Sequence, residues 1–282
     1  MFKAGYVALV GQPNAGKSSL TNALVGEKVA IISPKPQTTR DNIIGIVTTD
    51  DYQIVLVDTP GIHHSKNALD KAMMKNVRSA VSGVDLVLYL VDGTTQPSEE
   101  EQEYIQHLKE KVEDRVLVIK TKCDLKKLKS FECDMEISAL TGQNIDKLKQ
   151  KMLEFLPEYS EKHYIYDKDY YTDKSVKFLI SEEIREKALN ILHQEVPHGI
   201  AVEIIRFNEN KDIVYIDADL VCENDRHKGM IIGKGGLTLK KIGSDARDYT
   251  EKLLGKKVML KIFVKVEKDW RNKPEKIKSL GY

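Results

Sequence analysis

The chain has 282 residues, of which 41% are hydrophobic and 31% charged, so it can form packed cores beneath a heavily solvated surface. This length suggests about two domains. No apolar run is long enough to span a membrane, and the first residues lack the pattern of a signal peptide. We therefore expect no membrane-spanning segment, and we expect any membrane contact to be peripheral.

The three cysteines, Cys123, Cys133 and Cys222, have no metal-ligand spacing and do not form an even-numbered framework. Such usage is typical of a reducing compartment, because disulfides persist mainly outside the cytoplasm. We expect a cytoplasmic protein, whose peripheral membrane contact, if there is any, would be at the inner face of the cell membrane.

The net charge of +1 conceals a strong asymmetry along the chain. Residues 226–282 hold 16 Lys and Arg against 6 Asp and Glu, whereas the rest of the chain holds 28 against 37. A basic segment of this kind predicts a polyanionic partner.

The first predicted elements are an apolar strand, a glycine-bounded loop and a helix, and the loop reads GQPNAGKS. Glycine permits backbone N–H groups to converge on phosphates. Lys17 can reach the β and γ phosphates, and the Ser18 hydroxyl can ligate magnesium at the start of the helix. An ordinary turn is the alternative, which the flanking strand and helix disfavour. The predicted phosphate-binding residues are Gly11, Gln12, Pro13, Asn14, Ala15, Gly16, Lys17, Ser18 and Ser19.

The next stretch, residues 30–42, contains two prolines and no hydrophobic period, which predicts a mobile loop. In it, Thr38 or Thr39 could give a second hydroxyl to magnesium. Two strand-like runs follow as a hairpin, and the second ends at DTPG. There Asp58 can hold magnesium through water, and the Gly61 N–H can sense the γ phosphate.

Further apolar runs at 84–91 and 116–119 alternate with predicted helices up to residue 155. This order predicts an α/β domain with a mostly parallel, doubly wound sheet and a ligand at its carboxyl edge. The run 116–119 leads to Thr121, Lys122 and Asp124, and a carboxylate there can accept both the N1–H and N2–H donors of guanine. Adenine has neither donor. Ser138, Ala139 and Leu140 follow at the next strand end, and this order of motifs favours a guanine-nucleotide site over a set of surface turns.

Residues 157–172 are rich in tyrosine and charge and break the pattern, which indicates a linker. Its tyrosines could stack on bases, but packing against the neighbouring domains is the preferred interpretation. After it we predict a helix at 175–193, a hairpin at 201–221, the loop Gly233–Gly236 before a second helix, and a last strand at 258–266. That strand alternates in polarity, which predicts a sheet covered on one face only.

Residues 1–156 resemble the translation-factor-type GTPases, because GQPNAGKS, TTR, DTPG, TKCD and SAL follow the order of that family's motifs. Thr121 stands where the guanine motif more often has asparagine, as in Rho-type GTPases. Ile62 replaces the glutamine that orients water in Ras-like enzymes, so we expect slow intrinsic hydrolysis. The resemblance implies that Asn14 is associated with a potassium ion. The residues that it implies for catalysis are Lys17, Asn14, Thr39 and Gly61, and those for magnesium are Ser18, Thr39 and Asp58.

The tetrad Gly233-Lys234-Gly235-Gly236 resembles the GXXG loop of a KH domain, which clamps about four nucleotides. Alone it is equally typical of an inter-helix turn, but the order of the flanking elements matches an α+β, type II KH domain, and the basic segment coincides with it. Ile231 and Ile232 could line an apolar groove for bases. The predicted RNA-binding residues are Lys228, Ile231, Ile232, Gly233, Lys234, Gly235, Gly236, Lys240 and Lys241.

A GTPase domain followed by a type II KH domain resembles the Era family of bacterial GTPases, and the terminal WRNKPEKIKSLGY extends the match. The predicted boundaries are 1–156 for the GTPase domain, 157–173 for the linker and 174–282 for the KH domain. The resemblance implies a monomer that uses GTP, GDP and Mg²⁺, binds small-subunit ribosomal RNA near its 3′ end and acts in assembly of the small ribosomal subunit.

Two other functions remain open from the residues. One is a constitutive RNA-binding module whose nucleotide site is mainly structural. The other is a P-loop kinase, which Asp124 disfavours because a guanine-selecting carboxylate does not suit ATP.

Overall fold

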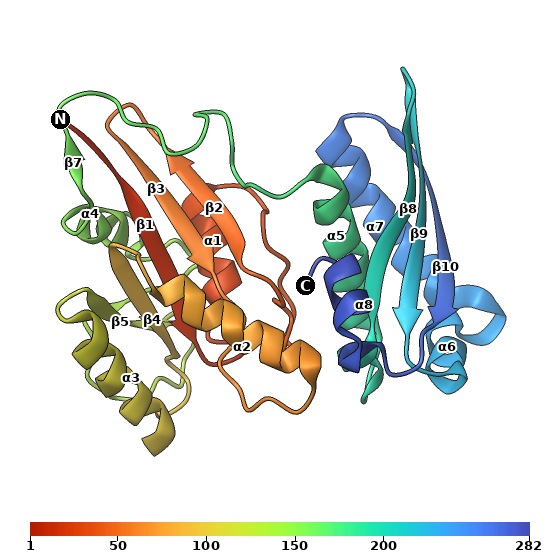
Figure 1. Ribbon diagram of the computed structural model, residues 1–282, viewed down its shortest axis with the longest axis horizontal. Helices are drawn as coiled ribbons and strands as arrows, with labels where there is room; N and C mark the ends of the chain where they lie inside the picture. The colour runs from red at the N-terminus through yellow and green to blue at the C-terminus, as the bar shows by residue number, and fades with distance from the viewer. The chain divides into compact units, whose positions relative to one another are not determined.

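The computed structural model describes residues 1–282, and its chain forms two compact units (Figure 1). The first unit contains residues 1–30, 39–64 and 73–173. The second contains residues 174–282 together with two short segments from the first half of the chain, 31–38 and 65–72. None of the helices combines the length and apolarity that crossing a bilayer requires.

The first unit is built on one sheet with the strand order β2-β3-β1-β4-β5-β6, and β7 pairs with the start of β1. All neighbours in that order are parallel except β2 and β3, which form the predicted hairpin. The strands are β1 Phe2–Gly11, β2 Ile43–Thr48, β3 Tyr52–Asp58, β4 Leu86–Asp92, β5 Val116–Thr121, β6 Met135–Glu136 and β7 Glu158–Tyr159. The doubly wound, mostly parallel sheet predicted from the sequence is confirmed.

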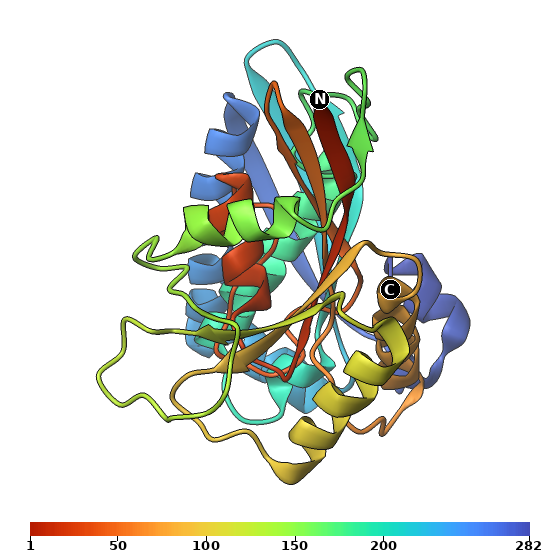
Figure 2. The same ribbon diagram turned by 90° about the vertical axis from the view of Figure 1, so that its left-hand side faces the viewer.

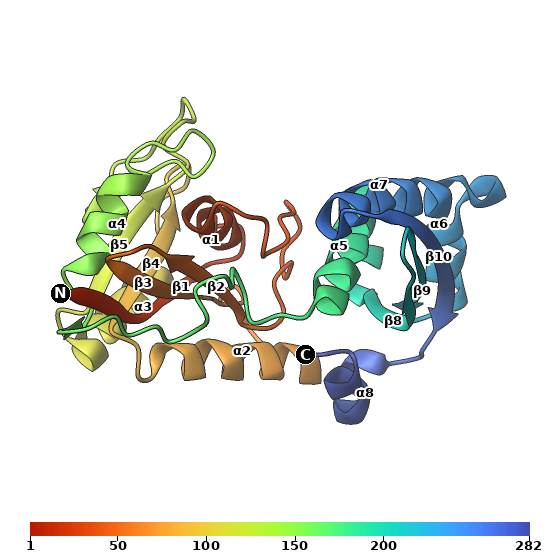
Figure 3. The same ribbon diagram turned by 90° about the horizontal axis from the view of Figure 1, so that it is seen from above.

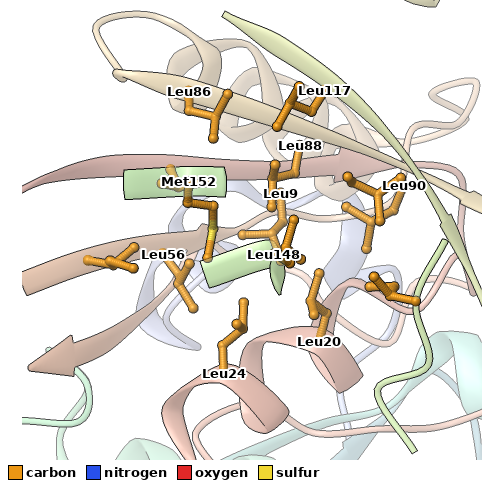
Figure 4. Close-up of a cluster of buried hydrophobic side chains, with 14 of the residues drawn as sticks. Leu9, Leu20, Leu24, Leu56, Leu86, Leu88, Leu90, Leu117, Leu148 and Met152 are labelled. Carbon is orange, nitrogen blue, oxygen red and sulfur yellow. The ribbon is translucent and has the colours of Figure 1, made fainter. Parts of the chain in front are cut away.

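Helices cover both faces of this sheet because its strands are apolar on both sides. The helices α1 (Lys17–Val25) and α4 (Ile145–Leu153) pack on one face, and α2 (Ala68–Val81) and α3 (Glu99–Val112) on the other. Figure 3 shows α1 and α2 on opposite sides of the strands. In the first core Leu20 and Leu24 of α1 meet Leu9 and Leu56 of the sheet (Figure 4). This packing fixes the end of β1 against the start of α1.

The tyrosine-rich segment at 157–173 lies with the first unit. Its strand β7 runs beside the N-terminal strand (Figure 2), pairing Tyr159 with Phe2. Further along, the backbone N–H groups of Ile165 and Tyr166 donate to Gln53 Oε1 at 2.7 and 2.9 Å. The segment is therefore held along the sheet by backbone hydrogen bonds.

The second unit has a three-stranded sheet of order β10-β9-β8, in which β9 pairs antiparallel with β8 and parallel with β10. Its elements are α5 Val176–Ile191, β8 Ala201–Glu209, β9 Ile213–Cys222, α6 Asp225–Ile232, α7 Leu237–Leu254, β10 Lys257–Val266 and α8 Pro274–Ser279. Helices α5, α6 and α7 share one core with the inner face of the sheet. Met259 and Phe263 of β10 are exposed on the other face, which agrees with the predicted alternation.

Candidate guanine-nucleotide site and nucleic-acid interface

The phosphate loop joins the end of β1 to the start of α1, and two glycines let it approach neighbouring backbone. A Cβ on Gly11 would lie 2.3 Å from the Leu90 carbonyl oxygen. A Cβ on Gly61 would lie 2.7 Å from the Pro13 Cα and N atoms. No larger residue fits at either position unless the backbone moves. The close approach of Gly61 to Pro13 brings the Gly61 N–H beside the phosphate loop, which is where a γ-phosphate sensor is predicted.

Lys17 is buried at the bottom of this loop. Its Nζ donates to the carbonyl oxygens of Gly11 and Gln12 at 3.0 and 2.9 Å. Burial lowers the pKa of Lys17 to about 8, although the charge of Asp58 opposes the shift. A phosphate anion near the ammonium would favour its charged form, so this environment suits an anionic ligand.

Three oxygen-bearing side chains converge next to the loop. Ser18 Oγ donates to Asp58 Oδ2 at 2.7 Å and lies 2.9 Å from Thr39 Oγ1. Asp58 Oδ1 is buried and has no hydrogen-bond partner, and burial raises the pKa of Asp58 to about 6. The Thr38 hydroxyl instead donates to the Lys35 carbonyl oxygen at 2.6 Å, so Thr39 is the threonine at this cluster. Hard oxygen donors with one buried, unsatisfied carboxylate oxygen fit a small divalent cation.

A cavity of about 220 Å³ lies between the phosphate loop and the last two motifs. Ser138 Oγ donates to Asp124 Oδ1 at 2.5 Å, which holds the carboxylate in this cavity. The lining contains Gly16, Ser19, Leu20, Thr121, Lys122, Asp124, Leu125, Ile137, Ala139 and Leu140. The predicted guanine selector is thus brought together with the predicted loop residues.

Sequence reasoning missed the apolar lining of this cavity and one acidic partner. Leu20, Leu125 and Ile137 carry no motif, since apolar residues beside strand ends are common. Asp92 at the end of β4 pairs with the Lys122 Nζ at 2.5 Å. Its position at a strand end was the only available signal. The ion pair holds Lys122 against β4, under the place where a base would lie.

Thr121 occupies the position where asparagine is more usual, and its contacts account for the substitution. Its side chain is buried, and its single hydroxyl proton lies between two acceptors, the Ala15 carbonyl oxygen at 2.8 Å from Oγ1 and the Val91 carbonyl oxygen at 3.1 Å. The hydroxyl therefore links the guanine motif to the phosphate loop and to β4.

Replacing Thr121 with valine keeps the shape but leaves the Ala15 carbonyl oxygen unsatisfied. A buried group left unpaired costs about 1–3 kcal/mol, so GDP affinity should fall about 5- to 100-fold. Titration with a fluorescent GDP analogue measures the change. Thr121→Ser keeps the hydroxyl and is the control; equal affinities for the valine and serine variants would contradict this role.

Ile62, at the position of the water-orienting glutamine, is turned toward the protein interior. It packs against the core between the sheet and helices α2 and α3, and its N–H donates to the Gly11 carbonyl oxygen at 3.1 Å. An apolar, inward side chain cannot orient a water molecule. Slow intrinsic hydrolysis therefore stays a prediction. Asn14 lies at the exposed tip of the loop with a positive φ of 64°.

In the second unit, the tetrad between α6 and α7 is a sharp glycine turn. Gly233, Gly235 and Gly236 have φ values of 71°, 60° and 77°, and a Cβ on Gly233 would lie 2.1 Å from Thr238 Oγ1. The Lys234 side chain is exposed between these glycines. The turn thus presents bare backbone and one cation at the surface.

A groove of about 470 Å³ runs from this turn between α7 and β10. Its lining combines apolar side chains, small residues and cations: Gly236, Leu239, Lys240, Gly243, Ser244, Arg247, Leu260 and Ile262. Only Gly236 and Lys240 were among the predicted RNA-binding residues. Gly243, Ser244 and Arg247 follow Lys240 at helical spacing on α7, which is the signal that could have found them.

The other predicted RNA-binding residues lie elsewhere. Ile231 is completely buried in the core of the unit, so it is not available to a base, and Ile232 and Lys228 are half-buried on α6. Lys241 pairs with Asp245 at 3.2 Å and is not part of the groove lining. The apolar surface of the groove comes instead from Leu239 of α7 and from Leu260 and Ile262 of β10.

Known protein families match both units. The family described as 50S ribosome-binding GTPase matches residues 6–122, and the KH domain family matches residues 195–271. The GTPase Era of Thermoanaerobacter sp. strain X514 is 45% identical over 295 residues, covering 99% of this chain and 96% of the relative. The GTPase Era of Clostridium botulinum strain Hall is 43% identical over 296 residues, covering 100% and 99%.

Two solved structures are similar over the full length. One is a crystal structure of Era in complex with MgGDPNP and nucleotides 1506–1542 of 16S ribosomal RNA, with a TM-score of 0.92 and 34% identity over 100% of this chain and 99% of that one. The other is an Aquifex aeolicus Era variant bound to GDP and AlF4⁻, with a TM-score of 0.91 and the same identity and coverage.

Proposed function

We propose, since this chain belongs to the family of Era GTPases, that it is a GTP-hydrolysing switch that binds small-subunit ribosomal RNA near its 3′ end. The second unit would supply the RNA site, and the protein would act in assembly of the small ribosomal subunit. The observation that carries the proposal is the presence, in one chain, of a cavity that joins Asp124 to the phosphate loop and of a groove with cationic side chains beside a glycine turn.

The groove has the chemistry that single-stranded RNA requires. Lys234, Lys240 and Arg247 can pair with phosphates, while Leu260 and Ile262 offer an apolar surface to bases. The bare backbone of the glycine turn can approach the sugar-phosphate chain closely. An apolar surface beside phosphate-binding groups suits bases that are free of a duplex, so unpaired nucleotides are the proposed ligand.

Crosslinking in cells followed by sequencing of the attached RNA tests this proposal most broadly. The expected result is enrichment of the 3′ end of small-subunit ribosomal RNA, which is lost when Lys234 and Lys240 are both replaced by glutamate. Enrichment of large-subunit RNA, or of no defined region, would overturn the proposed partner.

We also propose that Ser18, Thr39 and, through water, Asp58 hold a magnesium ion. The ion would neutralise charge on the β and γ phosphates when nucleotide is bound. The support is the convergence of their oxygens and the buried, unpartnered Asp58 Oδ1. A full-length similar structure contains MgGDPNP, which agrees with this assignment.

Asn14 is proposed to bind a potassium ion that offsets transition-state charge, because Ile62 leaves the site without a water-orienting side chain. GTP turnover should then be at least about tenfold faster in potassium than in sodium, below the roughly 100-fold that one preorganised donor to a transition state supplies. Asn14→Ala should abolish the difference while GDP affinity is kept. Turnover that is the same in both salts would contradict the role.

We also propose the location and the oligomeric state of the protein. It is cytoplasmic and acts as a monomer, and any membrane contact is peripheral, at the inner face of the cell membrane. Sedimentation of the purified protein and fractionation of cell extracts test both points. A stable dimer, or a pool that only detergent releases, would contradict them.

A further inference from the structure

Arg185, on α5 of the second unit, is a charged side chain with 0% exposure. Burying a charge is costly unless it is paired. Its Nε donates to Glu182 Oε1 at 2.7 Å and its Nη2 donates to Glu182 Oε2 at 2.5 Å, so the guanidinium and the carboxylate one turn earlier form a two-pronged pair. The pair is neutral as a whole, and its planar geometry fixes the direction of the remaining guanidinium donors.

The same Nη2 also donates to the main-chain carbonyl oxygen of Thr38. Thr38 ends the segment 31–38, which belongs to the second unit although it precedes β2 in the chain. The segment is held at its other end by Ile31, which packs into the core of the second unit. Beside Thr38, the Gln37 Nε2 donates to Asp70 Oδ1 at 3.0 Å and holds the same end of the segment.

The boundary between the units falls at the peptide bond between Thr38 and Thr39. Thr39 belongs to the first unit, and its Oγ1 lies 2.9 Å from Ser18 Oγ. The Thr38 carbonyl that Arg185 holds is part of the planar peptide group that ends at the Thr39 Cα. Only rotations within Thr39 itself separate that fixed plane from the Thr39 hydroxyl.

We propose that Arg185 is a positioning residue for Thr39: it holds the peptide group from which the Thr39 hydroxyl extends beside Ser18. The inference rests on the proposed magnesium role of Thr39 and is independent of RNA binding. A purely structural role is the competing explanation, since Tyr282 Oη also donates to Glu182 Oε1 at 3.5 Å.

A positioning role and a purely structural role predict different nucleotide affinities. A structural loss would lower the affinity for every nucleotide, whereas Thr39 is expected to contact magnesium only when a γ phosphate closes the loop. The double variant Glu182→Gln with Arg185→Met removes the two charges of the pair together. Its matched control is Glu183→Gln with Lys187→Met, which removes an ion pair of 2.7 Å from the same helix.

The full-length protein is titrated with a non-hydrolysable GTP analogue and with GDP, both with Mg²⁺. In the Arg185 double variant, affinity for the analogue should fall about tenfold, as expected for loss of one charge-assisted hydrogen bond, with GDP changed by less than about twofold. Amide hydrogen exchange in residues 37–41 should accelerate even in protein free of nucleotide and metal. The control pair should change none of these.

Equal losses for both nucleotides, or no loss for either, would overturn the role of Arg185. If the double variant does not fold, Arg185→Lys makes the same comparison, since lysine keeps the charge beside Glu182 but has no second nitrogen for Thr38. The variant Thr39→Ala separates this inference from the magnesium proposal. If neither Thr39→Ala nor the Arg185 double variant lowers affinity for the analogue, the magnesium assignment fails. If Thr39→Ala lowers that affinity and the Arg185 double variant does not, only the Arg185 inference fails.

Discussion

Replacing Asp124 with asparagine is expected to lower GTP affinity by at least about a thousandfold, the scale on which a site built for hydrogen bonds rejects a ligand that cannot make them. The carboxylate accepts two N–H donors of guanine, whereas an amide turns its own N–H toward one of them. Xanthine carries a carbonyl where guanine has the amino group, so xanthosine nucleotides should bind the variant instead. Ser138 Oγ already holds Asp124 Oδ1 at 2.5 Å, and the variant side chain should keep that orientation.

Competition between fluorescent GDP and unlabelled GDP, xanthosine diphosphate and ADP measures this exchange of specificity. Ser138→Ala is the control, because it frees the Asp124 carboxylate without removing it and should lower the affinity for GDP only about tenfold. An Asp124→Asn protein that still prefers GDP to xanthosine diphosphate would show that another group selects the base.

Replacing Gly243 with leucine should lower RNA affinity by at least about tenfold, since filling the groove displaces a base worth about 1–3 kcal/mol. Gly243 lines the groove on α7, and a Cβ there would lie 3.6 Å from Ile262 Cδ1, an ordinary contact. A longer side chain therefore extends into the groove between α7 and β10. Leucine also has a higher helix propensity than glycine, so the fold of the second unit should be kept.

Gly243→Ala is the matched control, because its methyl group fits beside Ile262 and leaves most of the groove open. Fluorescence anisotropy with an oligonucleotide from the 3′ end of small-subunit ribosomal RNA gives both affinities, and GTP turnover without RNA should be unchanged in both proteins. Equal RNA affinities for the leucine and alanine variants would place the bases outside this groove.

The nucleotide site was predictable from the sequence because its chemistry requires particular residues at fixed spacing. Lys17 and Asp124 each follow a strand end in a motif whose order also fixes the α/β fold. The residues alone left the choice between Thr38 and Thr39 open, since adjacent hydroxyls differ only in the turn of the backbone, and only the family resemblance pointed to Thr39. In the structure the Thr38 hydroxyl donates to Lys35 and its carbonyl accepts from Arg185, whereas the Thr39 hydroxyl lies beside Ser18.

The groove that we propose for RNA was predictable only in outline. The glycine tetrad locates the turn, but helical spacing cannot say which apolar residues line the groove and which fill the core. Ile231 is in the core, and Leu260 and Ile262 lie in the groove although the alternation of β10 marks both only as facing inward. The attachment of residues 31–38 to the second unit depends on a contact with Arg185, far along the chain, that no local pattern encodes.

In the proposed switch, GTP bound by the first unit controls RNA binding by the second. The affinity of the full-length protein for the same ribosomal RNA oligonucleotide, measured with a non-hydrolysable GTP analogue and with GDP, tests this coupling. Binding should be tighter with the analogue by at least about fivefold, the lower end of ordinary coupling between sites. Equal affinities in the two nucleotide states would contradict it.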